Sequence, residues 1–178
     1  MAGKCVQKNI PTFIPMILQR SYVKNRITIF QNWNKRKTVF FYEFGSLEAA
    51  MRQLDIMWEI KNYLEKHPKA TIVNLGCGFD EMGKACDNGN CNIVNIDFPD
   101  IIDVRNQLIM SREREINIPC DIKDYSWMNE VDGSDGVIFI AAGVFHYFGQ
   151  NEVKELAFKL SEKYSGGCLV LTLSESLV

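Results

Sequence analysis

The sequence predicts an α/β fold in which a mainly parallel, doubly wound sheet is flanked by helices. Short β-branched or aliphatic runs alternate with stretches in which apolar residues recur every three or four positions, a pattern typical of strands connected by helices. Several of the runs are followed directly by glycine or by an acidic residue, and the carboxyl ends of parallel strands are where such sheets bind ligands. The predicted strands are 71–75, 92–96, 115–120, 136–142 and 168–173, and the predicted helices are 46–66, 81–86, 100–112 and 151–164.

The charge distribution divides the chain into two parts. The 178 residues, 47% of them hydrophobic, indicate one domain with a substantial core, but residues 1–42 contain eight Lys or Arg residues and no acid. We expect residues 1–45, which are rich in aromatic side chains, to form a cap over the ligand crevice, and residues 46–178 to form the main domain. A basic arm packed on an acidic body explains the asymmetry, and an arm that meets an anionic substrate or nucleic acid is the alternative. Since no nucleic-acid recognition motif accompanies the arm, we expect no nucleic-acid partner.

The cysteines and the N-terminal segment indicate a cytoplasmic protein. The six cysteines form no Cys-x-x-Cys pair, and only two histidines could complete a metal site, so we expect reduced thiols and no metal. The apolar segment 10–18 contains two prolines and is not followed by a cleavage site of small residues. We therefore expect neither a signal peptide nor a membrane span.

A helix is expected before the first strand. Ser46 suits its N-cap, and His67–Pro68 ends it near Lys66. Arg52 lies one helical turn before Asp55, and a surface ion pair between them is the default interpretation. The apolar residues that define the helical period are Leu47, Ala50, Met51, Leu54, Met57, Trp58 and Leu64.

The run Thr71–Leu75 leads directly into a glycine pair. Its composition is typical of a strand buried on both faces, while Gly76 and Gly78 allow a tight turn and the close approach of a ligand to the backbone. For this segment alone, a plain turn is an equal alternative. Asp97 favours the ligand site, because it comes 21 residues after Gly76, where one strand-helix-strand unit places a carboxylate beside the ribose of an adenine nucleotide. A loop acid without that role is the alternative.

Two further strand ends carry similar signals. Asp121, with Ile122 beside it, follows the third predicted strand, and Gly143 follows the fourth. Acids and glycines at three strand ends together favour a nucleotide-type cofactor.

The glycine turn also indicates which cofactor binds. The third glycine of a dinucleotide fingerprint is missing, and Asp80 and Glu81 stand where a pyrophosphate needs backbone N–H groups and no negative charge. S-adenosylmethionine carries a sulfonium, an ammonium, ribose and adenine but no phosphate, so it suits an acidic crevice. We expect Asp97 to accept hydrogen bonds from the ribose hydroxyls and Asp121 to accept from the adenine amino group.

Four segments carry a family resemblance: Val73–Asp80 (VNLGCGFD), Asp97–Ile102 with Arg105, Asp121–Ile122 with Trp127, and Phe139–Phe148 (FIAAGVFHYF). Together they resemble the leucine carboxyl methyltransferase family, which includes bacterial O-methyltransferases of the polyketide-biosynthesis type. The resemblance covers about residues 46–170. It implies a Rossmann-like class I methyltransferase fold, S-adenosylmethionine as cofactor, and methylation of a carboxyl or hydroxyl group of a small molecule. It also implies that Arg52 binds the carboxylate of the cofactor, with Gly76, Gly78, Asp97, Asp121 and Ile122 completing the site.

Two features depart from the family pattern. Ala142 stands where phosphatase-directed members have a glutamate, so the chain looks more like the small-molecule branch. A complete class I methyltransferase sheet has seven strands, whereas the sequence yields five before Val178. We expect a sheet truncated after the fifth strand, whose apolar edge either pairs with another chain, as in a homo-oligomer, or is covered by a C-terminal extension.

His146 is the candidate general base. A hydroxyl substrate needs a proton acceptor whereas a carboxylate does not, and His146 is the only imidazole near the predicted strand ends. An aromatic packing segment around His146 is the alternative. Two other functions stay open: a non-catalytic regulatory module that binds S-adenosylmethionine, and an NAD-binding oxidoreductase.

Overall fold

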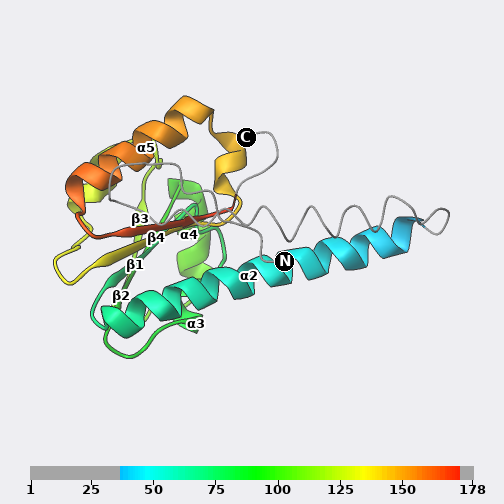
Figure 1. Ribbon diagram of the computed structural model, residues 1–178, viewed down its shortest axis with the longest axis horizontal. Helices are drawn as coiled ribbons and strands as arrows, with labels where there is room; N and C mark the ends of the chain where they lie inside the picture. The colour runs from blue at the N-terminus through cyan, green and yellow to red at the C-terminus, as the bar shows by residue number, and fades with distance from the viewer. Residues whose placement is uncertain (1–36, 173–178) are drawn as a thin grey trace, which may run out of the picture.

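The computed structural model describes residues 37–172, and the side chains of residues 51–172 (Figure 1). Within this part of the chain, five strands form one parallel sheet with the order β3-β2-β1-β4-β5. The strands are β1 Thr71–Leu75, β2 Asn92–Asp97, β3 Glu115–Pro119, β4 Val137–Ala141 and β5 Cys168–Leu171. The chain runs from β1 outward to β3 and then returns to the other side of β1, so the strand order reverses between β1 and β4. The predicted doubly wound α/β fold is confirmed.

The two strands beside this switch point are buried along their whole length. All residues of β1 and of β4 are buried, and Ile72 of β1 lies in register with Ile93 of β2 and Ile138 of β4. Such burial explains why these runs are apolar on both faces, because helices cover both sides of the sheet.

Each face of the sheet has its own core. One face is covered by α5 (Gln150–Lys163) and the 3-10 helix η1 (Tyr125–Asn129), and its core includes Trp127, Phe139 and Leu160. The opposite face is covered by α2 (Lys37–Lys66) and α3 (Met82–Ala85), as Figure 1 shows for α5 and α2. The helix α4 (Pro99–Leu108) lies beside β3, so it connects the second and third strands along the outer part of the sheet.

The helix before the first strand begins earlier than predicted. It starts at Lys37 and passes through Gly45 and Ser46, because no proline interrupts residues 37–66 and a single glycine inside a helix costs only about 1 kcal/mol. The predicted boundary between residues 45 and 46 therefore falls inside α2, and residues 1–36 of the predicted cap lie outside the described residues. The predicted end of the helix is correct: its last residue is Lys66, just before His67–Pro68.

The face that α2 turns to the sheet matches the predicted apolar residues only in part: Leu64 is in the core and Met57 packs against it. Ile56, Ile60 and Leu64 are buried against the sheet, whereas Leu54 and Trp58 are 65% and 62% exposed. Two apolar stripes run along this helix, and only the one at 56, 60 and 64 fits the core. The sequence period identified the helix but not its orientation.

Two other helix boundaries move by a few residues. Ile109 is extended, so α4 ends at Leu108 and not near 112, and Lys84 Nζ donates to the carbonyl of Met110 just beyond it (2.7 Å). The helix α5 begins at Gln150, one residue before the predicted start at 151, and its N-cap is Gly149, whose N–H donates to Glu152 Oε2 (2.6 Å). Among the described helices, none combines the length and hydropathy of a membrane span.

Candidate functional site

The glycine turn after β1 is held against the ends of β2 and β4. Gly76 and Gly78 both have positive φ angles, of 67° and 48°, and the N–H of Gly76 donates to the carbonyl of Ile96 in β2 (2.9 Å). A Cβ at position 76 would lie 2.5 Å from Val144 Cγ2, whereas one at position 78 would meet nothing within 4 Å. Gly76 is therefore required for packing, and Gly78 leaves open space above the turn.

Asp97 at the end of β2 is bonded to this turn. Its Oδ2 accepts from the N–H of Gly78 (2.7 Å), and its Oδ1 accepts from the N–H of Phe98 (2.8 Å). An ionised carboxylate has about four lone-pair sites, so both oxygens keep capacity for another donor. The structure thus brings three predicted site residues, Gly76, Gly78 and Asp97, into one unit at the switch point of the sheet.

An open groove of about 560 Å³ lies beside the ends of β2 and β3. Its lining includes Phe98, which is 53% exposed, and three acids, Asp121, Asp124 and Glu130. None of the described residues that line it is basic. The groove therefore suits a ligand that is apolar in part and offers hydrogen-bond donors or positive charge.

The two predicted residues after β3 face different surroundings. Asp121 is exposed, and its Oδ1 accepts from the N–H of Lys123 (2.9 Å). Ile122 is buried in the core, where its carbonyl accepts from Trp127 Nε1 (3.0 Å) and its side chain lies near Gly76. Asp121 is thus available to a ligand in the groove, while the buried side chain of Ile122 packs near Gly76 of the turn.

In the segment after β4, Phe145 packs in the core while the neighbouring His146 is exposed. The segment begins at Gly143, whose N–H donates to Thr172 Oγ1 (2.7 Å), and it forms the 3-10 helix η2 (Val144–Tyr147). Phe145 is fully buried and its ring lies 5.4 Å from that of Phe148, so the aromatic packing role belongs to these residues. His146 is exposed. Its role as a base stays a prediction, as does the contact of the half-buried Arg52 on α2 with a cofactor carboxylate.

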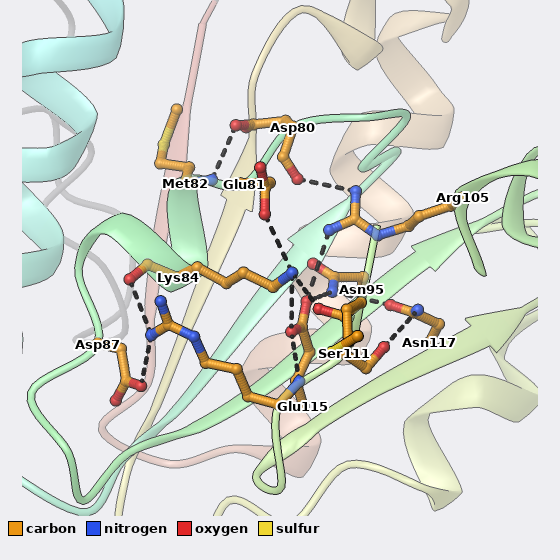
Figure 2. A network of polar contacts seen from close by, with 12 residues as sticks. Asp80, Glu81, Met82, Lys84, Asp87, Asn95, Arg105, Ser111, Glu115 and Asn117 are labelled. Carbon is orange, nitrogen blue, oxygen red and sulfur yellow. Dashed lines mark hydrogen bonds and ion pairs between the residues drawn. The ribbon is translucent and has the colours of Figure 1, made fainter. Parts of the chain in front are cut away.

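A buried arginine supports the glycine turn from α4. Figure 2 shows Arg105 pointing toward Asp80 and Glu115. Its Nη1 donates to the carbonyls of Gly78 (2.9 Å) and Asp80 (2.8 Å), and its Nη2 lies 3.5 Å from Glu115 Oε1. Both charged side chains are only 1% exposed. The sequence motif contained Arg105, but its partners lie 25 and 27 positions away, and no local pattern predicts the contact.

The polar network around Glu115 joins two strands and α3. Asn95 Nδ2 donates to Glu115 Oε1 (2.8 Å) and to Asn117 Oδ1 (2.9 Å), across the register of β2 and β3. Lys84 Nζ lies 3.4 Å from Glu115 Oε2 and 3.0 Å from Glu81 Oε1 (Figure 2). The carboxylate of Glu115 is therefore satisfied by several donors, as a buried charge requires.

Cys77, in the glycine turn, has a thiol of low reactivity. Cys77 is 2% exposed, and burial raises the pKa of its thiol to about 12 although the nearby Arg105 opposes the rise. The thiol therefore stays neutral at physiological pH and is a poor nucleophile. Among the described residues, no group of three or more His, Cys, Asp or Glu side chains is placed to hold a metal ion.

Comparison with solved structures identifies the fold. Monomeric WbdD has a TM-score of 0.56 at 20% identity, covering 70% of this chain and 31% of WbdD. The N-methyltransferase NodS from Bradyrhizobium japonicum has a TM-score of 0.52 at 13% identity, covering 71% of this chain and 69% of NodS. The plantazolicin methyltransferase BamL, in complex with a triazolic desmethylPZN analog and SAH, has a TM-score of 0.51 at 18% identity, covering 79% of this chain and 52% of BamL. The chain has the class I methyltransferase fold.

A curated relative is also a methyltransferase. The tetracenomycin polyketide synthesis O-methyltransferase TcmP of Streptomyces glaucescens is 22% identical over an alignment of 125 residues, and the match covers 65% of this chain and 46% of TcmP. This chain thus spans less than half the length of the curated relative that it matches. No protein-family model matches the sequence, so the narrower resemblance to the leucine carboxyl methyltransferases stays a prediction.

Proposed function

We propose that this chain contains the cofactor-binding part of an S-adenosylmethionine-dependent O-methyltransferase that acts on a carboxyl or hydroxyl group of a small molecule. The observation that carries the proposal is the hydrogen bond that Asp97 accepts from the N–H of Gly78. It lies at the switch point of the sheet, beside an acidic groove. The similarity to TcmP supports the same reaction class.

The residues present fit S-adenosylmethionine better than a dinucleotide. The space above Gly78 admits a ligand close to the backbone, and the acids of the groove would repel a pyrophosphate. Asp97 would accept from the ribose hydroxyls with its remaining lone pairs, Asp121 would accept from the adenine amino group, and Arg52 would bind the carboxylate. This arrangement disfavours an NAD-binding oxidoreductase.

The bound cofactor would supply an electrophilic methyl group on a positively charged sulfur. The chain's own contribution is then chiefly positioning, because an in-line displacement needs the reacting atoms to be roughly 3–3.5 Å apart and aligned. A carboxylate substrate needs no base. For a hydroxyl substrate, the exposed imidazole of His146 after β4 is the proposed proton acceptor.

Calorimetric titration with S-adenosylmethionine and S-adenosylhomocysteine tests the cofactor. We expect both to bind in the micromolar range, and a well-folded sample that binds neither would refute the proposal. Incubation with S-adenosylmethionine and a panel of small carboxylic acids and phenols, followed by mass spectrometry, tests the reaction. A methylated product excludes the hypothesis of a non-catalytic regulatory module. Tight binding of NAD in the calorimetric titration would instead favour the hypothesis of an oxidoreductase.

A further inference from the structure

The glycine turn is held from two sides by groups that come from different elements. Asp97 at the end of β2 accepts from the N–H of Gly78, while Arg105 of α4 donates to the carbonyl of the same residue. A second bond from Arg105 reaches the carbonyl of Asp80 (2.8 Å). Both peptide groups that flank Gly78 are thereby fixed, although the glycine itself has the freest backbone of any residue.

The guanidinium is suited to this contact in a way that an ammonium is not. One nitrogen, Nη1, carries both bonds to the turn, and the second, Nη2, faces Glu115 Oε1 at 3.5 Å. The planar fork fixes the angle between these contacts, whereas the ammonium of lysine is a compact point charge on a flexible stem. Arg105 Nε is buried without a hydrogen-bond partner. The side chain thus keeps its two hydrogen bonds to the turn even though one of its buried N–H donors has no acceptor.

Glu115 makes the burial of this cation tolerable. Both side chains are 1% exposed, and Glu115 is itself held by Asn95 Nδ2 (2.8 Å) and by the N–H of Arg112 (3.1 Å). A buried charge that loses its partner is strongly destabilising, so Arg105 cannot turn away from the pair at low cost. The position of α4 is thus coupled to the shape of the turn.

We infer that Arg105 is a positioning residue that sets the conformation of the glycine turn for cofactor binding, acting through the carbonyls of Gly78 and Asp80. This inference rests on the proposed function for its link to S-adenosylmethionine. Arg105 touches no ligand in this role. Its effect reaches the cofactor because the orientation of the Gly78 peptide also determines where the carboxylate of Asp97 is held.

Two variants test the inference without leaving a buried charge unpaired. Arg105→Lys keeps the charge but loses the planar fork, and the double variant Arg105→Met with Glu115→Gln removes both charges at similar volume. Ile102→Val is the matched control, because Ile102 is 2% exposed on the same helix, whereas the hydrogen bonds to Gly78 and Asp80 described above come from Asp97 and Arg105. Circular dichroism and thermal unfolding first establish which variants fold.

The readouts are the affinity for S-adenosylhomocysteine and the hydrogen exchange of the Gly78 amide in the absence of ligand. We expect both Arg105 variants to bind at least tenfold more weakly and to exchange the Gly78 amide faster, while Ile102→Val changes neither beyond its effect on overall stability. A folded Arg105 variant with the affinity and the Gly78 protection of the natural sequence would overturn the inference.

The two proposals fail in distinguishable ways. If the natural sequence does not bind S-adenosylhomocysteine, the proposed function fails, and the exchange of the Gly78 amide still decides the positioning role. If the natural sequence binds and both folded variants bind equally well, the proposed function stands and the role of Arg105 is refuted.

Discussion

Asp97 has a structural role that the sequence did not predict. As an acid at a strand end it is predicted to contact ribose, and in the structure its Oδ2 accepts a hydrogen bond from the N–H of Gly78 (2.7 Å). This carboxylate therefore fixes the turn and still has lone pairs that can accept hydrogen bonds from a ligand. A change at this residue should affect cofactor affinity through both roles.

The replacement Asp97→Asn tests this dual role. It removes the charge at constant size, so we expect binding of S-adenosylmethionine to weaken by about 1.5–3 kcal/mol, the range for hydrogen bonds to charged groups. Isothermal titration gives the difference directly. Asp100→Asn is the control, since Asp100 is an exposed acid in the first turn of α4. Equal affinities for Asp97→Asn and the natural sequence would remove Asp97 from the site.

Arg52 is the second residue whose role can be measured. If it binds the cofactor carboxylate with a bidentate contact, Arg52→Ala should weaken S-adenosylmethionine by about 1.5–3 kcal/mol, and Arg52→Lys should restore only part of the loss. Lys61→Ala, an exposed cation on the same helix, should leave the affinity unchanged. If Arg52→Ala also leaves it unchanged, the surface pairing with Asp55 becomes the better interpretation.

At the scale of elements, α2 shows which face of a helix matters. Ile60 is fully buried against the sheet, so Ile60→Ala should lower the free energy of unfolding by about 2–5 kcal/mol. Leu54, 65% exposed, lies on the other stripe, and Leu54→Ala should change it by no more than about 0.5 kcal/mol. Urea denaturation of the two variants checks both values. Similar losses would mean that the stripe at Leu54 is covered in solution.

The turn between α3 and β2 should contribute to acid sensitivity. Burial alone would raise the pKa of Asp87, but the N–H of Gly89 and the guanidinium groups of Arg112 and Arg114 outweigh it and hold the pKa below its ordinary value of 3.8. A carboxyl with a depressed pKa stabilises the fold above its unfolded pKa, and that stability is lost as the pH falls through the folded value.

Unfolding measured between pH 6 and pH 2 tests this contribution of Asp87. The natural sequence should lose stability below about pH 4, and Asp87→Asn should be less stable at neutral pH and lose less on acidification. Parallel curves for the two proteins would show that Asp87 has no net role.

The strands were predictable because their signals are local. The β-branched run 71–75 carries its structure in adjacent residues, and the strand predicted there is confirmed. The orientation of α2 was not predictable, since Leu54 and Ile56 are equally apolar and only the sheet selects between them. The contact of Arg105 with Gly78 was missed for the same reason: it exists only once α4 and the turn are packed together.

At the scale of the molecule, the sheet ends in two different ways. The β3 edge lies beside α4 and carries the Glu115 network, whereas β5 pairs only with β4 among the described residues. The N–H of Thr172 donates to Ala141 on β4 (3.2 Å). Because backbone groups of successive strand residues point to opposite sides, the N–H of Leu171 points away from β4, where it can pair with another strand.

Pairing with a second copy of this chain and cover by a further segment of the protein are the two predicted fates of this edge, and for the 178-residue chain by itself we expect self-association through β5 at high concentration. Leu171→Pro would remove the outward N–H while leaving the bond from Thr172 to β4 in place, so it should shift the chain toward monomer in light scattering across a concentration series. Leu171→Ala is the matched control, because it trims the same side chain but keeps the N–H. Association that persists in Leu171→Pro, or a chain that stays monomeric throughout with a rapidly exchanging Leu171 amide, would contradict the expectation. Weakened association in the proline variant alone would assign the contact to backbone pairing at this edge, since the loss of apolar side-chain area is common to both variants.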